Sequence, residues 1–219
     1  MTKLKNIVIY GAGGMAREIV YLIEDINRAE PEWNVLGHLD DDPSLAGKLL
    51  NNYKVLGDFK ALASLPKPLY LVLGIAKPEI KEKIVAKIKQ HALQIEYPVL
   101  IHPAAKVSHY SLLGPGTIVT ADSIVSINTK LGYHVFLNFK CVISHDALIG
   151  DNSSLMNGVV ISGNATLENK CYLGTNAVVL PGKTIGQESI IGAGAVVNND
   201  IPAFATAVGV PAKVIQQRS

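Results

Sequence analysis

The second half of the chain repeats every six residues. From Ile101 to Val197, every sixth residue is isoleucine, leucine or valine, without an exception. Neither an α-helix, with a period of 3.6 residues, nor a strand, with a period of two, produces this spacing. A fixed longer period is typical of solenoids, in which each turn of the chain packs on the next. The repeat therefore predicts a solenoid.

The residues between the aliphatic positions suit tight corners. The fourth residue after each aliphatic is mostly small, and glycine often follows the aliphatic directly, as at Gly114, Gly132 and Gly150. We expect each hexad to form one short strand and one corner, with the aliphatic side chain inside. Three hexads would close a triangular coil, so that residue n lies beneath residue n+18. Cys141 and Cys171 occupy two of the small positions, which predicts buried thiols without a disulfide.

The first half of the chain has a different pattern. Apolar, strand-like runs at 6–10, 33–40 and 69–74 alternate with helix-like segments at 16–27 and 78–90. This βαβαβ order predicts a small parallel sheet covered by helices. We therefore expect two domains, an α/β Rossmann-like domain at 1–100 and a parallel β-helix of hexapeptide repeats at 101–219.

A glycine-rich turn links the first predicted strand to the first predicted helix. The segment "GAGGMA", from Gly11 to Ala16, matches the phosphate-binding pattern G-x-G-x-x-A, and Asp40 ends the next strand, where it could bind a ribose. The domain is only about half of a full dinucleotide fold, which favours a mononucleotide. Alternatively, the glycines only permit a tight turn, and Asp40 to Asp42 form a solvated turn.

One histidine lies within the repeat beside small residues. By the 18-residue rule, Gly163 stacks directly on His145 and leaves space and a backbone N–H next to the imidazole. Such a pair could serve an acyl transfer, with His145 as general base and Gly163 as oxyanion donor. Asp146 could orient the ring if the corner bends the chain. The alternative is that both side chains are solvated corner residues.

Composition argues against several classes of protein. The formal net charge of +2 is spread along the chain, which gives nucleic acid little to bind. No apolar run is long enough to span a membrane, and no signal peptide is evident at the N-terminus. We expect a cytoplasmic protein that binds neither nucleic acid nor membrane.

Together, the uninterrupted repeat, the segment "GAGGMARE" and the ending "GVPAK" resemble a family of sugar acetyltransferases. The family includes bacterial sialic acid O-acetyltransferases and nucleotide-aminosugar N-acetyltransferases, and the resemblance spans nearly the whole chain. It implies a left-handed parallel β-helix, a homotrimer, acetyl-CoA as co-substrate and a nucleotide-linked sugar as acceptor.

The resemblance also implies roles for particular residues. The segment "ISHDALIG" matches the family's catalytic motif, which makes His145 the base beside Asp146. The remaining positions fall into two groups. Those expected to bind the nucleotide sugar are Gly13, Gly14, Met15, Asp40, Asp41 and Gly74, and those expected to contact CoA are Ser154, Gly163, Thr175, Ala193 and Lys213. Many aminosugar acetyltransferases of the family have histidine at the position of Met15, so this residue bears on the acceptor.

We expect N-acetylation of a nucleotide-linked amino sugar. The alternatives are O-acetylation of a sugar such as sialic acid, and a trimeric scaffold that binds a nucleotide sugar without catalysis. Hexapeptide coils also hold zinc in γ-type carbonic anhydrases, and His109 shares a stacking position with His145. A zinc site needs a third protein ligand, which the sequence does not provide here, so we expect no metal.

Overall fold

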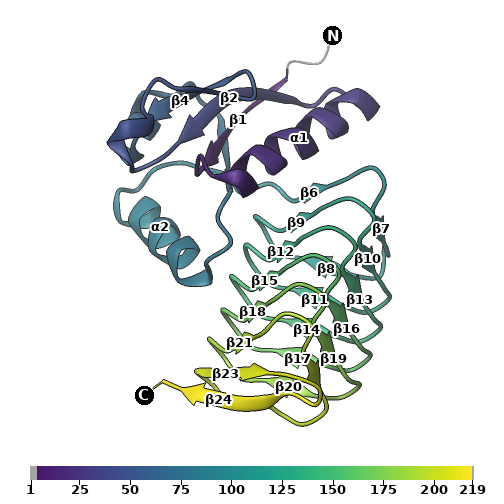
Figure 1. The fold of residues 1–219 in the computed structure, drawn as a ribbon. Helices are drawn as coiled ribbons and strands as arrows, with labels where there is room; N and C mark the ends of the chain where they lie inside the picture. The colour runs from purple at the N-terminus through teal and green to yellow at the C-terminus, as the bar shows by residue number, and fades with distance from the viewer. Residues whose placement is uncertain (1–3, 219) are drawn as a thin grey trace. The chain divides into compact units, whose positions relative to one another are not determined.

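The computed structural model describes residues 4–218, and the chain divides into two compact units (Figure 1). The N-terminal unit contains the residues up to 76 together with 80–98, and the C-terminal unit contains 77–79 together with those from 99 onward. Within the described residues, neither α-helix combines the length and apolarity needed to cross a membrane.

The N-terminal unit is built on a sheet with the strand order β3-β4-β2-β1-β5. Strands β1 (Lys5–Tyr10), β2 (Trp33–Leu39), β4 (Tyr53–Gly57) and β5 (Leu69–Leu73) are parallel, and β3 (Leu49–Leu50) pairs antiparallel with β4. Helices α1 (Gly14–Ala29) and α2 (Pro78–Gln90) follow β1 and β5. The predicted strands and helices are confirmed, but the βαβαβ order is not, because no α-helix lies between β2 and β5 in the described chain. That stretch instead contains β3, β4 and the short helices η1 (Pro43–Leu45) and η2 (Phe59–Ser64), which were not predicted.

Alternating residues of β1 point to the two faces of this sheet. Val8 and Tyr10 pack in one cluster with Ile84 and Ile88 of α2. On the other face, a Cβ atom added to Gly74 would lie 2.6 Å from Ala16 Cβ and 3.0 Å from Ile9 Cγ2, so α1 packs closely against this end of β1. Helices therefore cover both faces, as the βαβ pattern predicts.

The C-terminal unit is a parallel β-helix in which each hexad contributes a strand of two residues (Figure 1). The strands are β6 (Leu100–Ile101), β7 (Lys106–Val107), β8 (Leu112–Leu113), β9 (Ile118–Val119), β10 (Ile124–Val125), β11 (Lys130–Leu131), β12 (Phe136–Leu137), β13 (Val142–Ile143), β14 (Leu148–Ile149), β15 (Ser154–Leu155), β16 (Val160–Ile161), β17 (Thr166–Leu167), β18 (Tyr172–Leu173), β19 (Val178–Val179), β20 (Thr184–Ile185), β21 (Ile190–Ile191) and β22 (Val196–Val197). They form three sheets, because every third strand pairs with the next one in its sheet.

The 18-residue stacking rule is confirmed by the strand register. Ile143 of β13 pairs with Ile161 of β16 and with Val125 of β10, each 18 residues away. The aliphatic positions from Val119 onward are buried and form one continuous core along the stack. Ile101 differs, because its side chain is 38 % exposed at the first coil. Cys141 and Cys171 are buried and free, as predicted.

The corners depend on a backbone conformation that the sequence analysis did not identify. Between Gly116 and Gly194, the third residue after every aliphatic position has a positive φ, close to +60° for the non-glycine residues. Glycine, asparagine and aspartate adopt this left-handed conformation more readily than other residues, and they occupy most of these positions. Each such residue turns the chain from one sheet to the next.

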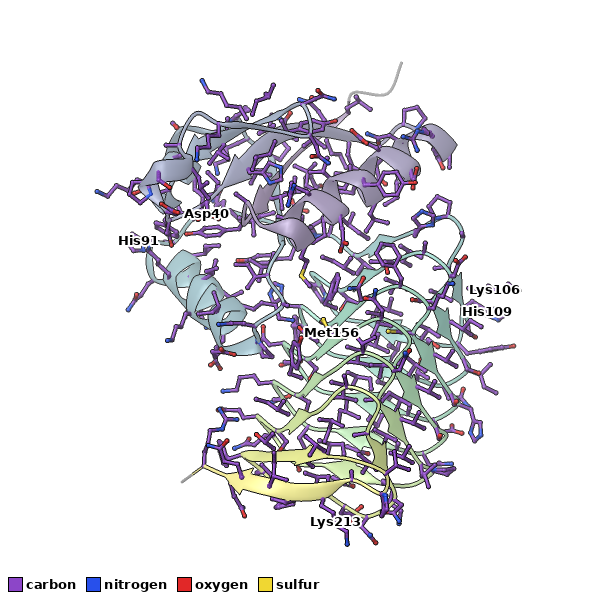
Figure 2. All side chains as sticks on the ribbon, in the orientation of Figure 1. Asp40, His91, Lys106, His109, Met156 and Lys213 are labelled. Atoms are coloured by element: carbon purple, nitrogen blue, oxygen red, sulfur yellow. The ribbon has the colours of Figure 1, made fainter. Side chains whose placement is uncertain are left out.

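The repeat ends in a hairpin instead of another coil. Strand β23 (Ala205–Val208) continues the eight-stranded sheet in parallel with β21, and β24 (Lys213–Gln217) returns antiparallel to it. Figure 2 shows Lys213 on this hairpin, at the opposite end of the solenoid from Lys106 and His109. The hairpin therefore ends the stack and covers the last buried aliphatic residues.

Candidate functional site

His145 and Asp146 lie at the corner where the chain passes from β13 to β14, which we call the histidine corner. Asp146 has a φ of +59°, and this bend brings its Oδ2 atom to 2.8 Å from His145 Nδ1. The two side chains are 55 % and 44 % exposed. If Nδ1 carries the proton and donates to the carboxylate, Nε2 is left with a free lone pair, as a general base requires.

Gly163 lies next to the imidazole on the coil above. A Cβ atom at this position would lie 2.5 Å from His145 Cε1 and 2.6 Å from Nε2, so only glycine leaves room for the ring in this position. The amide of Asn164 donates to the carbonyl of His145 over 3.0 Å and joins the two coils. Among the described residues, the Gly163 N–H has no hydrogen-bond acceptor. At the equivalent position of other corners, the amides of Tyr133 and Asp151 donate to side-chain oxygens.

The second carboxylate oxygen of Asp146 is also held. Asn128, on the coil below, donates from Nδ2 to Asp146 Oδ1 over 3.2 Å. The hydrogen bonds from His145 and Asn128 lower the pKa of Asp146 from its ordinary value, and the larger effect is that of His145. The carboxylate therefore stays ionised and can stabilise an imidazolium.

The glycine turn of the N-terminal unit is braced by Asp40. Gly11 has a φ of +118°, and a Cβ atom there would lie 2.8 Å from the carbonyl oxygen of Gly74, so glycine at this position permits the close approach. Asp40 accepts hydrogen bonds from the amides of Ala12 and Asp42 over 2.9 and 3.0 Å. Its carboxylate thus holds the turn in addition to any contact with a ribose.

The helix that follows begins without a side-chain cap. Gly13 is the N-cap of α1, it is exposed, and a Cβ atom added there would meet nothing within 4 Å. Gly14 is also exposed, and Met15 is half-buried in the first turn. Free amides at a helix N-terminus attract phosphate groups, so this end of α1 suits the nucleotide predicted for it.

Two buried polar side chains support the same turn. Tyr10 donates to both oxygens of Asp41, over 2.8 and 2.9 Å, and burial together with this carboxylate raises the pKa of the Tyr10 phenol. His38 is fully buried with Nδ1 3.0 Å from the carbonyl oxygen of Gly11, and burial lowers the pKa of its imidazole. No motif in the sequence pointed to Tyr10 or His38.

Apart from Gly163, the positions expected to contact CoA lie away from the histidine corner. Thr175 and Ala193 stack at the corner after β18 and β21, which we call the threonine corner, and both are exposed. Ser154 of β15 is fully buried, and its hydroxyl has no hydrogen-bond partner among the described residues. Lys213 is exposed on β24. Of the CoA positions, the structure brings only Gly163 to the histidine.

Comparisons with known proteins agree with this fold. Residues 6–88 match the family model described as the PglD N-terminal domain. PerB from Caulobacter crescentus, solved in complex with CoA and GDP-perosamine, is 30 % identical with a TM-score of 0.88, and the match covers 98 % of this chain and 99 % of that one. This chain belongs to the hexapeptide-repeat sugar acetyltransferase family.

Two further relatives are similar to this chain. The acetyltransferase domain of PglB from Neisseria gonorrhoeae, in complex with acetyl coenzyme A, is 28 % identical with a TM-score of 0.87, over 97 % of this chain and 100 % of that one. A GDP-perosamine N-acetyltransferase of Escherichia coli O157:H7 is 30 % identical over 126 residues, which span 57 % of this chain but only 55 % of the curated relative. The C-terminal unit is accordingly a left-handed parallel β-helix, as the resemblance implied.

The zinc alternative gains no support in this acetyltransferase. Within residues 4–218, no group of three or more histidine, cysteine, aspartate or glutamate side chains could hold a metal ion. His109 and His145 share their stacking position two coils apart, but Ile127 lies between them. The absence of a metal in the reaction remains a prediction.

Proposed function

We propose that this protein transfers the acetyl group of acetyl-CoA to the amine of a nucleotide-linked amino sugar. The observation that carries the proposal is the histidine corner, where His145 is oriented by Asp146 and faces the open position of Gly163. A family relative that matches this chain over 99 % of its own length was solved with CoA and GDP-perosamine bound, which supports this donor and this class of acceptor.

The reaction follows from the geometry of this corner. The acceptor amine attacks the thioester carbonyl carbon, and His145 Nε2 takes the proton that the nitrogen loses as the C–N bond forms. The N–H of Gly163 stabilises the oxyanion of the tetrahedral intermediate. The C–S bond then breaks, and the imidazolium returns the proton to the leaving thiolate. Asp146 holds the ring and stabilises its charged form throughout.

The nucleotide part of the acceptor is assigned to the glycine turn of the N-terminal unit. The free amides at Gly13 and Gly14 would receive the phosphates, Asp40 and Asp41 would lie along the nucleoside, and Gly74 keeps the turn close to the sheet. Met15 adds an apolar side chain in the first turn of α1, where it would contact the sugar.

A homotrimer would complete the donor site. His145 and Thr175 lie at different corners of one β-helix, so a CoA molecule that contacts both fits between two copies of the chain. The sheet formed by β7, β10, β13, β16, β19 and β22 also carries a row of outward aliphatic side chains on consecutive coils. The members of this row are Ile124, Val142, Val160, Val178 and Val196. Such a row suits packing against another copy.

The proposal is tested by product analysis with a panel of acceptors. Purified protein and acetyl-CoA are incubated with GDP-perosamine, with UDP-linked 4-amino sugars and with sialic acid, and the products are weighed by mass spectrometry. We expect an acetyl group on a nucleotide amino sugar, as an amide that survives mild base. An ester formed on sialic acid would instead favour O-acetylation, and binding of a nucleotide sugar without any product would favour a scaffold.

The cytoplasmic location also stays a prediction, which cell fractionation would check.

A further inference from the structure

Both oxygens of the Asp146 carboxylate take part in hydrogen bonds. Oδ2 lies 2.8 Å from His145 Nδ1, and Oδ1 accepts the Nδ2–H of Asn128 over 3.2 Å. With only the histidine contact, an exposed carboxylate could rotate about χ2, because this torsion has a broad energy minimum. The second contact fixes the plane of the carboxylate, and therefore the direction from which it accepts the Nδ1 proton.

The position of Asn128 is itself well defined. It lies one coil below Asp146 at the same stacking position, with a φ of +58° that asparagine tolerates well. The backbone between the two coils is joined directly beside it, because the amide of Asp146 donates to the carbonyl of Ile127 over 3.1 Å. The side-chain amide is thus presented to the carboxylate from a backbone that the ladder holds in place.

The absence of charge on the Asn128 side chain also matters. Its amide donates a hydrogen bond without adding a positive charge, so Asp146 keeps its full negative charge for the imidazole. Asn164, at the same position on the coil above, is uncharged as well, and the hydrogen bonds that lower the pKa of Asp146 come from His145 and Asn128. A carboxylate in place of Asn128 would instead repel Asp146 at close range.

We propose that Asn128 is a positioning residue for catalysis, which acts through Asp146 to hold His145 with its proton on Nδ1 and its lone pair on Nε2. Asn128 touches neither acceptor nor thioester in this proposal. The inference rests on the proposed function of His145 as the base, and it adds a third member, from a neighbouring coil, to the pair of residues at the corner.

Two variants of Asn128 test the proposal. Asn128→Gly keeps the positive φ and removes the amide, and we expect kcat to fall about tenfold with little change in KM, a part of what general base catalysis contributes. Asn128→Asp keeps the shape of the side chain but replaces the hydrogen bond to Asp146 with repulsion between two carboxylates. We expect it to move the acidic limb of the kcat profile to higher pH by about one unit, because a second carboxylate favours the protonated states of Asp146 and His145. The matched control is Asn152→Gly, at a φ of +58° on another corner.

A spectroscopic measurement tests the same point without any acceptor. In protein with ¹⁵N-labelled histidine rings, the His145 signals, assigned by their loss in His145→Gln, report which nitrogen carries the proton. We expect the Nδ1–H form to dominate in the parent and in Asn152→Gly, and the Nε2–H form to gain population in Asn128→Gly. An unchanged tautomer in Asn128→Gly would overturn the proposal, as would a kcat within twofold of the parent. Failure of the parent to turn over the tested acceptors would count against the proposed function alone.

Discussion

At the scale of single residues, the contact between Gly163 and His145 gives the sharpest prediction. Gly163 has no positive φ, so alanine fits its backbone, but the added Cβ would lie within 2.6 Å of two ring atoms. The exposed ring can swing away, so we expect Gly163→Ala to lower kcat by at least about tenfold while the protein stays folded. Steady-state kinetics measure the loss in kcat, and thermal unfolding shows whether the protein stays folded.

Gly150→Ala is the contrasting variant. Its Cβ atom would meet backbone atoms of Glu168 and Asn169 at 2.5 and 2.6 Å, and a backbone ladder cannot move aside as a side chain can. We therefore expect Gly150→Ala to lower the midpoint of thermal unfolding. If Gly163→Ala were as destabilising as Gly150→Ala, or fully active, the proposed role of the open space beside His145 would be wrong.

The sequence predicted part of this corner and missed part of it for a clear reason. The family motif indicated His145, and the 18-residue rule added Gly163. The same rule places Asn128 beneath Asp146, but stacking alone does not show that the two side chains form a hydrogen bond. The hydrogen bonds of Asp40 to Ala12 and Asp42 could not be predicted, because they depend on the path of a turn that no periodicity describes.

At the scale of the structural element, the corners make a prediction about stability. Lys140 is exposed with a φ of +60°, a conformation that costs a lysine about 1 kcal/mol or more. Asparagine tolerates this conformation better, so we expect Lys140→Asn to stabilise the β-helix by about 0.5 to 1 kcal/mol. Urea unfolding of the two proteins measures the difference, and a lower midpoint for Lys140→Asn would contradict this account of the corners.

The buried cysteines predict how the stability of the β-helix depends on pH. Burial raises the pKa of Cys141 and of Cys171 to about 12, above the value near 8.5 of an exposed thiol. Because the folded state disfavours the thiolate, the associated stability is complete below pH 8.5 and is lost as the pH rises toward 12. We expect the urea midpoint to fall between pH 8 and pH 10.5, and to fall less in the double variant Cys141→Ala, Cys171→Ala.

The same prediction has a direct chemical check. At pH 8, a thiol reagent should leave both cysteines of the native protein unmodified and should react with both after unfolding in guanidinium. Rapid modification of the native protein at either position would contradict the burial of the thiols.

The elements differ in how well their sequence pattern described them. The hexads were predictable because each aliphatic residue must face the same core, which fixes the register of every coil. Strand β3 (Leu49–Leu50) was missed because it has only two residues, and β4 (Tyr53–Gly57) because its residues lack a clear alternation. The hairpin of β23 and β24 does not follow the six-residue repeat, so the repeat did not predict it. It ends the stack, because no further coil of the described chain packs on it.

At the scale of the whole molecule, the separation of the two corners predicts a site shared between copies. We expect His145→Ala and Thr175→Trp to be nearly inactive when tested alone. In trimers reassembled from an equal mixture, about a quarter of the sites would pair an intact His145 with an intact Thr175 from another copy, and activity should return to about that level. Sedimentation should show a trimer for each protein, and no recovery of activity in the mixture would contradict a shared site.

The central claim is that His145 takes the proton from the acceptor. The most direct measurement is the initial rate of CoA thiol release from acetyl-CoA, with the acceptor identified by product analysis, in the parent and in His145→Gln. Glutamine keeps a polar side chain at the corner but cannot act as a base, so we predict a loss in kcat of about 10² to 10⁴ with the fold intact. A folded His145→Gln protein with the kcat of the parent would contradict the claim.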